Sequence, residues 1–182
     1  MILKYNLSEN DYLQHQLYVA SKTDRVKKKR QQSRVAVTLL FGSLAVLFLQ
    51  TENSFLAYYF GGFAILSFIF YPLYLRRHYK VHYKEFIADT YKNRFGESIT
   101  IIFNNDKKTL ETHGITGTSK LDYSIFEEII EISEHIFIKI RTGGSLIIPK
   151  RLENIDYTVT TLKQLASQLQ IKYIDELNWK WK

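Results

Sequence analysis

Two long runs of uncharged residues lie almost back to back in the first half of this 182-residue chain. They cover residues 35–51 and 53–75, and only Glu52 separates them. A helix needs about 20 apolar residues to cross a hydrocarbon core of about 30 Å. The second run is long enough by itself, and the first approaches that length when flanking side chains snorkel. The sequence therefore predicts a transmembrane helical hairpin over 35–75, with spans at 35–51 and 54–75.

The alternative is a pair of buried helices in a soluble protein. We disfavour it because so small a chain has too little remaining surface to cover both runs, and soluble helices keep a polar face.

Lysine and arginine residues flank the predicted hairpin and are absent from its short connecting loop. Such residues concentrate on the cytoplasmic side of membrane helices. The basic residues expected to orient the hairpin are Lys27, Lys28, Lys29, Arg30, Arg34, Arg76 and Arg77. We therefore expect a multi-pass protein of the inner cell membrane with both termini in the cytoplasm. A cleaved signal peptide is disfavoured, because the apolar run begins only after 34 mostly polar residues.

Residues 1–34 are predicted to be a cytosolic strand followed by a basic helical arm. Ser8 and Asp11 have the spacing of a capping box at the start of this helix. Because no Gly or Pro lies between Ser8 and Phe41, we expect one helix to continue from the cytosol into the membrane. Residues 76–95 likewise contain no helix breaker and are predicted to form a helical stalk.

Residues 96–170 change to the alternating pattern of β-strands. Turn-forming residues separate the apolar segments, most clearly at Asn104–Asp106 and at Gly143 and Gly144. A helix follows, with Leu162, Leu165, Ala166 and Leu169 on one face and Asp156 as its expected cap. About six short antiparallel strands closed by a C-terminal helix predict a small pleckstrin-like domain, with residues 171–182 as a tail. Whether the N-terminal strand joins this domain is left open.

Several short motifs occur in a characteristic order. The chain opens with YNLSENDYLQHQLY, continues with the basic stretch and the two apolar runs, and then carries DYSIFEEIIEISEHIFIKI and LIIPKRL. In this order the motifs resemble the YcxB-like family of small bacterial membrane proteins, although Tyr123 stands where that family more often has tryptophan. The resemblance implies an α+β membrane protein with a pleckstrin-like C-terminal domain on a membrane hairpin. It brings no established activity and no catalytic residues.

The search for chemical sites gives only weak candidates. The absence of cysteine excludes a disulfide framework, a thiolate zinc site and a cysteine nucleophile. His78, His82 and Glu85 have the spacing of metal ligands on a helix, but we interpret them as stalk residues. The acidic residues Glu127, Glu128, Glu131 and Glu134 alternate with isoleucines and are interpreted as the wet face of a strand. We therefore predict no catalytic, cofactor-binding or metal-binding residue, and no cofactor.

Basic residues of the β-rich segment are the remaining candidates for binding. Lys107, Lys108, Lys150 and Arg151 lie at strand ends or turns, where they could contact a phosphate or a partner; the alternative is solvated surface charge that tolerates replacement by alanine. Nucleic acid is disfavoured because the positive charge is concentrated beside the predicted spans. We expect a membrane-anchored cytoplasmic interaction module that binds protein or anionic lipid. The alternative is a membrane enzyme or a small transporter subunit, and Gly42, Gly61 and Gly62 leave a homo-oligomer open.

Overall fold

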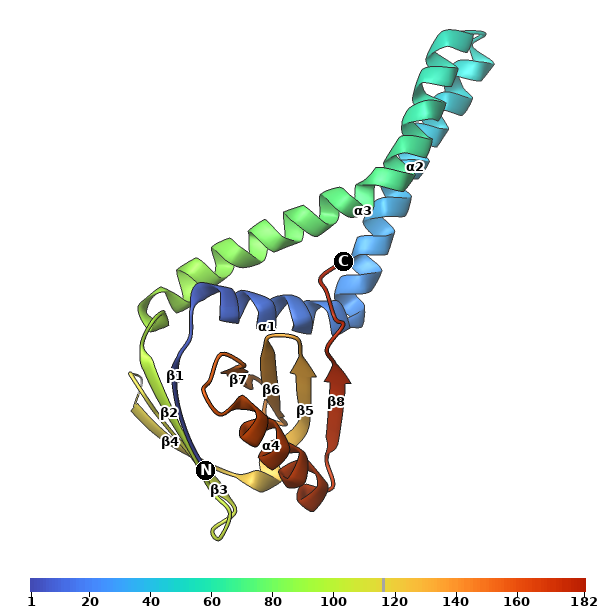
Figure 1. Ribbon diagram of the computed structural model, residues 1–182. Coiled ribbons are helices and arrows are strands. Elements are labelled where there is room, and N and C mark those ends of the chain that lie inside the picture. Colours follow the sequence, from blue (N-terminus) through green and yellow to red (C-terminus); the bar gives the residue numbers. More distant parts are fainter. Residues whose placement is uncertain (116) are drawn as a thin grey trace. The chain divides into compact units, whose positions relative to one another are not determined.

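The structure is a computed structural model that describes residues 1–115 and 117–182 (Figure 1). The chain divides into two compact units. The first, called here the β unit, combines Met1–His15 with Phe86–Lys180. The second, called the helical unit, comprises Gln16–Glu85 together with Trp181 and Lys182. Each unit is therefore built from segments that lie far apart in the sequence.

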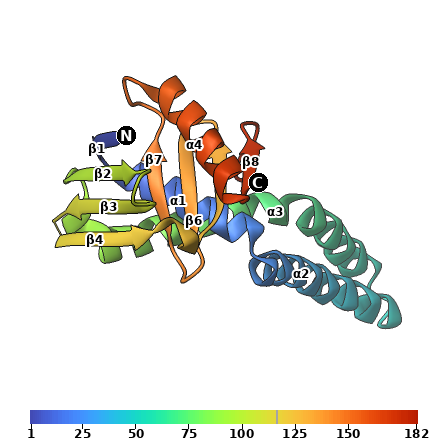
Figure 2. The same ribbon diagram turned by 90° about the horizontal axis from the view of Figure 1, so that it is seen from below.

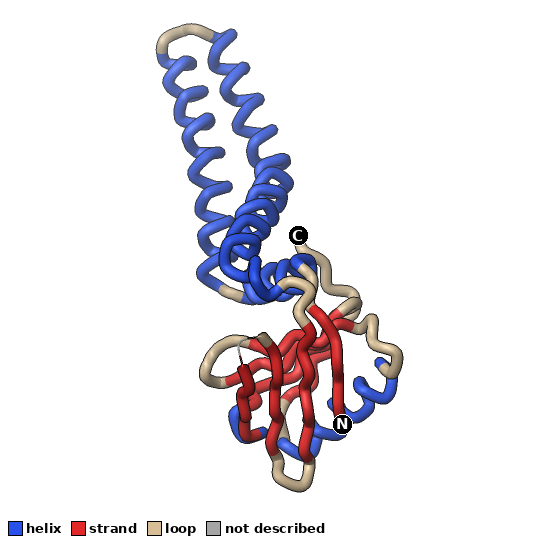
Figure 3. Tube along the Cα trace, turned by 90° about the vertical axis from the view of Figure 1, so that its left-hand side faces the viewer, coloured by secondary structure: helices blue, strands red, loops and turns tan. Residues whose placement is uncertain are grey.

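Two long helices dominate the helical unit. These are α2 (Asp24–Gln50) and α3 (Ser54–Tyr91), which run side by side as a hairpin (Figure 3). Both are long and apolar enough to cross a membrane, and only 6% of each apolar window is buried. Large apolar side chains such as Leu39 and Phe55 are exposed, while Phe48 stacks on Phe60 between the helices with ring centroids 5.4 Å apart. The predicted pair of long apolar helices is thus confirmed.

The prediction of one continuous helix from Ser8 into the first apolar run is wrong. The chain forms α1 (Glu9–Lys22) and then α2, with Thr23 between them in an extended conformation (φ −75°, ψ 117°). The Thr23 hydroxyl donates to the Val19 carbonyl at 2.8 Å, and Asp24 supplies a carboxylate to the first turn of α2. Thr23 is β-branched and hydrogen-bonds to the preceding turn, which favours the end of α1. Asp24 is acidic and favours the N-terminus of the next helix. The helix break therefore needs neither Gly nor Pro.

The α3 helix continues well past the second apolar run, as the lack of a breaker after it predicts. It contains Pro72 and ends at Tyr91, and a short 3₁₀ helix (Lys92–Arg94) follows. Gly96 then adopts a positive φ of 75°, which a glycine reaches without steric cost. The segment 76–95 is therefore helical over most of its length.

Eight strands of the described residues form two four-stranded sheets in the β unit. The first sheet has the order β1-β2-β3-β4, formed by Ile2–Asn6, Ser98–Asn104, Thr109–Gly114 and Gly117–Asp122. The second has the order β7-β6-β5-β8, formed by Ser145–Pro149, His135–Ile140, Phe126–Ile132 and Lys172–Glu176. Figure 2 shows the strands of the first sheet running crosswise to β6 and β7. The predicted hairpins β2–β3, β5–β6 and β6–β7 are all antiparallel.

Two strands join the sheets from outside the predicted range 96–170. β1 pairs antiparallel with β2, so the N-terminal strand belongs to the β unit. β8 lies in the segment that we interpreted as a tail, and it pairs parallel with β5. A parallel pair needs a long crossover connection, which the helix α4 (Ile155–Leu169) supplies. The β unit is therefore wider than 96–170.

Three of the four residues predicted for the apolar stripe of the C-terminal helix are buried, and Leu169 at its end is half-buried. Leu162, Leu165 and Ala166 are at most 5% exposed, on a helix that contacts β5 and β8. The expected cap is different, because Asn154 occupies the N-cap position and Asp156 lies within the first turn. There the Asp156 carboxylate still favours the positive end of the helix dipole. The coarse prediction of antiparallel sheets closed by a C-terminal helix is confirmed.

Candidate functional site

A buried ion cluster joins the N-terminal arm to the second sheet. Asp11, at the start of α1, is 2% exposed. Its carboxylate accepts two hydrogen bonds from the Arg151 guanidinium, at 2.7 and 2.8 Å, and lies 2.7 Å from Nε2 of His135. Arg151 also donates to the Asn6 carbonyl at 2.6 Å. One arginine therefore holds both β1 and α1.

The expected capping box explains why Asp11 stands at this point. The backbone amide and the hydroxyl of Ser8 both donate to Asp11 Oδ2, at 2.6 and 2.8 Å, and the Asp11 amide approaches Ser8 Oγ at 3.4 Å. Burial alone would raise the pKa of Asp11, but the hydrogen bonds from His135, Arg151 and Ser8 outweigh burial and hold the pKa well below its usual range. Asp11 is therefore a fixed negative charge.

Two histidines accompany this cluster. Because an ionised carboxylate only accepts hydrogen bonds, His135 carries a proton on Nε2, and its buried Nδ1 has no partner among the described residues. His15 packs edge-on against Phe137, with ring centroids 5.0 Å apart. Its buried Nε2 also has no hydrogen-bond partner among the described residues. Burial and the neighbouring His135 lower the pKa of His15 to about 4. His15 is thus neutral at physiological pH.

A second ion cluster is centred on β5, an inner strand of the second sheet. Glu131 on β5 is 5% exposed; it accepts hydrogen bonds from Lys150 and from the Tyr173 hydroxyl, and Lys163 lies 3.9 Å away. Burial alone would raise the pKa of Glu131, but the hydrogen bonds from Lys150 and Tyr173 lower it overall. Glu131 is therefore not a solvated strand residue, because it ties β5 to β8 and to the chain after β7.

The four basic residues proposed for phosphate or partner contact lie in two different settings. Lys150 and Arg151 are each engaged in the ion clusters just described. Lys107 and Lys108 lie in the β2–β3 turn, where Lys108 adopts a positive φ of 50° and the Lys107 amide donates to the Asn104 side chain at 3.0 Å. The acidic residues Glu127 and Glu128 instead pair with Lys139, at 2.8 and 3.1 Å. Lys150 and Arg151 are thus paired with carboxylates, whereas Lys107 and Lys108 lie exposed in a turn.

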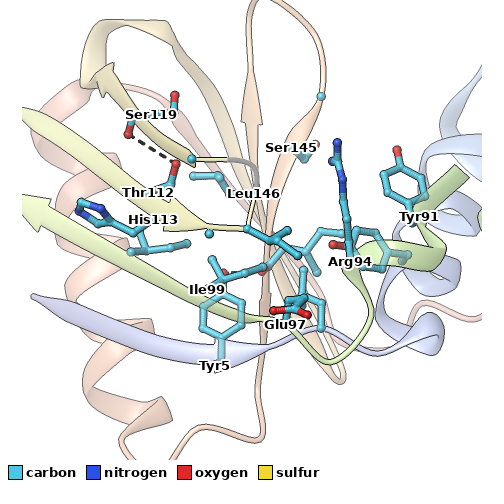
Figure 4. A pocket seen from close by; sticks show the side chains of 18 of the residues that line it. Tyr5, Tyr91, Arg94, Glu97, Ile99, Thr112, His113, Ser119, Ser145 and Leu146 are labelled. Carbon is cyan, nitrogen blue, oxygen red and sulfur yellow. Dashed lines mark hydrogen bonds between the residues drawn. The ribbon is translucent and has the colours of Figure 1, made fainter.

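A pocket of about 370 Å³ opens in the β unit (Figure 4). Its walls come from β1 to β4, from the start of β7, and from the residues around Tyr91 to Glu97. Tyr5, Ile99, Ile101 and Leu146 supply apolar surface. Gly114, Gly117 and Gly144 contribute backbone without a side chain to its lining. Sequence reasoning missed this pocket, since it requires β1 to be placed beside the start of β7.

Fixed polar groups position the walls of this pocket. The Tyr5 hydroxyl donates to the Ile147 carbonyl at 2.7 Å, which links β1 to β7, and burial raises the pKa of Tyr5. The Arg94 guanidinium lies over the Tyr91 ring, 5.6 Å from its centroid. Figure 4 shows Arg94 and Glu97 near one side of the pocket and His113 near the other. The pocket is therefore apolar inside with charged and polar groups at its margin, as is typical of binding sites.

The basic residues expected to orient the hairpin lie on the two long helices of the helical unit. Lys27, Lys28, Lys29, Arg30 and Arg34 are on α2, and Arg76 and Arg77 are on α3. Arg30 lies over the Trp181 ring, 4.9 Å from its centroid, and the Trp181 indole donates to the Arg76 carbonyl at 3.0 Å.

His78 and His82 are also on α3, and among the described residues no group of three His, Cys, Asp or Glu side chains is arranged to hold a metal ion.

Comparison with known families identifies part of the β unit. Residues 106–156 match the model of the YcxB-like protein family. This confirms the resemblance on the segment from the β2–β3 turn through β7 into the first turn of α4, a segment that contains His135 and Arg151. Asp11 lies outside the YcxB-like segment, yet it is the partner of both residues. No curated protein and no solved structure matches the chain.

Proposed function

We propose that this protein is a membrane-anchored interaction module. The helices α2 and α3 form its bilayer anchor, and the β unit is a pleckstrin-like domain that binds a partner on the cytoplasmic side. The main support for the anchor is the exposure of apolar side chains along both helices. In water these side chains would form a large exposed apolar surface, which soluble proteins rarely have. The crosswise sheets and the C-terminal helix support the pleckstrin-like assignment.

The pocket of the β unit is the proposed binding site. Its apolar walls suit an apolar side chain or short apolar segment of a partner protein, and polar groups at its margin suit the partner's backbone. Two strands beside it also have free edges, because within the described residues β4 pairs only with β3 and β7 only with β6. Free strand edges add backbone hydrogen bonds to an extended peptide. We therefore favour a protein partner over anionic lipid at this site.

Site-specific photocrosslinking in native membranes tests this proposal. A photoreactive residue at position 146, inside the pocket, should give a discrete crosslinked protein. The variant Ser145→Trp, which places a large side chain at the pocket wall, should abolish that crosslink. Ser167→Trp, at an exposed site on α4, is the matched control and should retain it. Crosslinks that persist unchanged in Ser145→Trp would contradict the pocket as the binding site.

A further inference from the structure

A small basic cleft lies within the helical unit, between α2 and α3. Its volume is about 230 Å³, and it is lined by Lys27, Arg30, Gln31, Arg34, Pro72 and Leu75. Pockets for drug-sized ligands usually exceed about 300 Å³, so this cleft suits a smaller group. Three of its lining residues are cationic, and among the described residues that line it none is acidic.

The proline in α3 accounts for the position of Arg34. Proline has no backbone N–H, so Pro72 leaves the carbonyl four residues earlier, that of Phe68, without its helical hydrogen bond. Arg34 Nε donates to this Phe68 carbonyl at 3.0 Å, and the guanidinium lies 3.7 Å from the centroid of the Phe68 ring. The side chain is therefore held by one of its five donors, and within the described residues the N–H groups on its two terminal nitrogens form no hydrogen bond.

Arg30 is fixed one turn away along the same helix. It donates to the Lys182 carbonyl at 2.6 Å and lies over the rings of Trp181 and Tyr79. Lys27 is held less firmly, since its side chain is 56% exposed and the side-chain partner described for it is the exposed Asp24 at 3.5 Å. The four cleft residues of α2 each lie three or four positions from another of the set, so they share one face of the helix: Lys27, Arg30, Gln31 and Arg34. The cleft thus presents two pre-positioned guanidinium groups and an exposed ammonium group.

The position of the cleft along the helices indicates what occupies it. The uncharged run of α2 begins at the next residue after Arg34, and that of α3 ends at Leu75, which lines the cleft. If these helices cross a bilayer, the cleft lies at the level of the phospholipid phosphates. Arginine pairs with phosphate through two parallel hydrogen bonds. The excess of positive charge along the cleft lining also disfavours the ammonium group of a zwitterionic headgroup.

We propose that this cleft binds the phosphate of an anionic phospholipid headgroup, with Arg34 and Lys27 as its main contacts and Arg30 as a supporting one. The inference rests on the proposed membrane anchor and deepens it, because it makes the basic end of α2 a specific lipid site in addition to a determinant of orientation.

Native mass spectrometry of the full-length protein in detergent tests this inference. The probes are short-chain phosphatidylglycerol, phosphatidylcholine of the same chain length, and inorganic phosphate. Phosphatidylglycerol should bind best, and Lys27→Gln should weaken it about fivefold, the loss expected for about 1 kcal/mol per basic residue near an anionic surface. Arg34→Gln should weaken binding further, while Lys28→Gln and Arg25→Gln, which make the same charge changes on α2 outside the cleft, should have little effect.

Three results would overturn the lipid site. They are equal binding of the two lipids, equal loss in Lys27→Gln and Lys28→Gln, and inorganic phosphate binding as tightly as phosphatidylglycerol. Lys27→Gln keeps the test valid even if Arg34→Gln disturbs the helix pair. Among the described residues the Lys27 side chain hydrogen-bonds to Asp24 of α2 itself and not to α3. Carbonate extraction of membranes reports separately on the anchor. An integral protein with no lipid preference would refute only this inference, whereas release by carbonate would refute the proposed function.

Discussion

The ion pair between Asp11 and Arg151 should contribute substantially to stability, although Arg151 looks like a surface residue in the sequence. Its side chain is 52% exposed, but its partner carboxylate is 2% exposed. Loss of one partner of a fully buried pair costs about 3–5 kcal/mol. In Arg151→Ala, water can partly replace the guanidinium, and Ser8 and His135 remain as donors to Asp11. We therefore expect a loss of about 2 kcal/mol, which replaces the expectation of a neutral substitution.

A double-mutant cycle separates this pair from general damage to the fold. Urea unfolding of the full-length protein in a mild detergent, followed by near-ultraviolet circular dichroism, gives the free energy of unfolding for Arg151→Ala, Asp11→Ala and the double variant. The coupling energy should be about 1–2 kcal/mol. Arg141→Ala, at an exposed site of the same unit, is the control and should change stability by less than about 0.5 kcal/mol. A neutral Arg151→Ala or an additive cycle would refute the reasoning.

Three further predictions concern both units. The pKa of His15 is about 4 in the fold and about 6.5 in the unfolded chain, so its contribution to stability is full above pH 6.5 and falls as the pH drops toward 4, by at most about 1.4 kcal/mol per pH unit. Thermal unfolding of His15→Phe should therefore show a weaker dependence of stability on pH in this range. An unchanged pH dependence would mean that another group causes it. Leu165→Ala, in the buried stripe of α4, should cost about 2–5 kcal/mol in the same urea assay, and a cost below 1 kcal/mol would mean that α4 does not close the core. Replacing residues 27–30 by glutamine should give some molecules with the N-terminus on the other side of the membrane, where added protease can cleave it. If the N-terminus stays fully protected from protease, the basic flank of α3 is sufficient to orient the hairpin.

Local periodicity was enough to predict most elements of this fold. The uncharged runs predict α2 and α3, and the turns at Asn104–Asp106 and at Gly143 and Gly144 predict the hairpins around them. Gly143 and Gly144 do adopt positive φ, of 100° and 84°. These features depend on a few neighbouring residues, so a single sequence contains the necessary information.

Long-range pairing was the part that local patterns could not supply. β8 has only five residues, and its parallel pairing with β5 depends on where α4 returns the chain. Similarly, Asp11 reads as a capping residue and Arg151 as a strand-end charge, and 140 positions separate them. The cue available in the sequence was that both residues lie in motifs of the family resemblance. Those two motifs meet in one ion pair, and Arg151 also donates to the Asn6 carbonyl of β1.

Cysteine accessibility gives the most direct test of the membrane-anchored module. The natural sequence contains no cysteine, so single substitutions can be labelled without background. Glu52→Cys lies in the loop between α2 and α3, and Ser167→Cys lies at an exposed site of α4 in the β unit. In intact cells whose outer membrane is permeable to the reagent, a maleimide that cannot cross the inner membrane should label Glu52→Cys and spare Ser167→Cys until the cells are lysed. Equal labelling of both positions before lysis, or labelling of Ser167→Cys alone, would contradict the account.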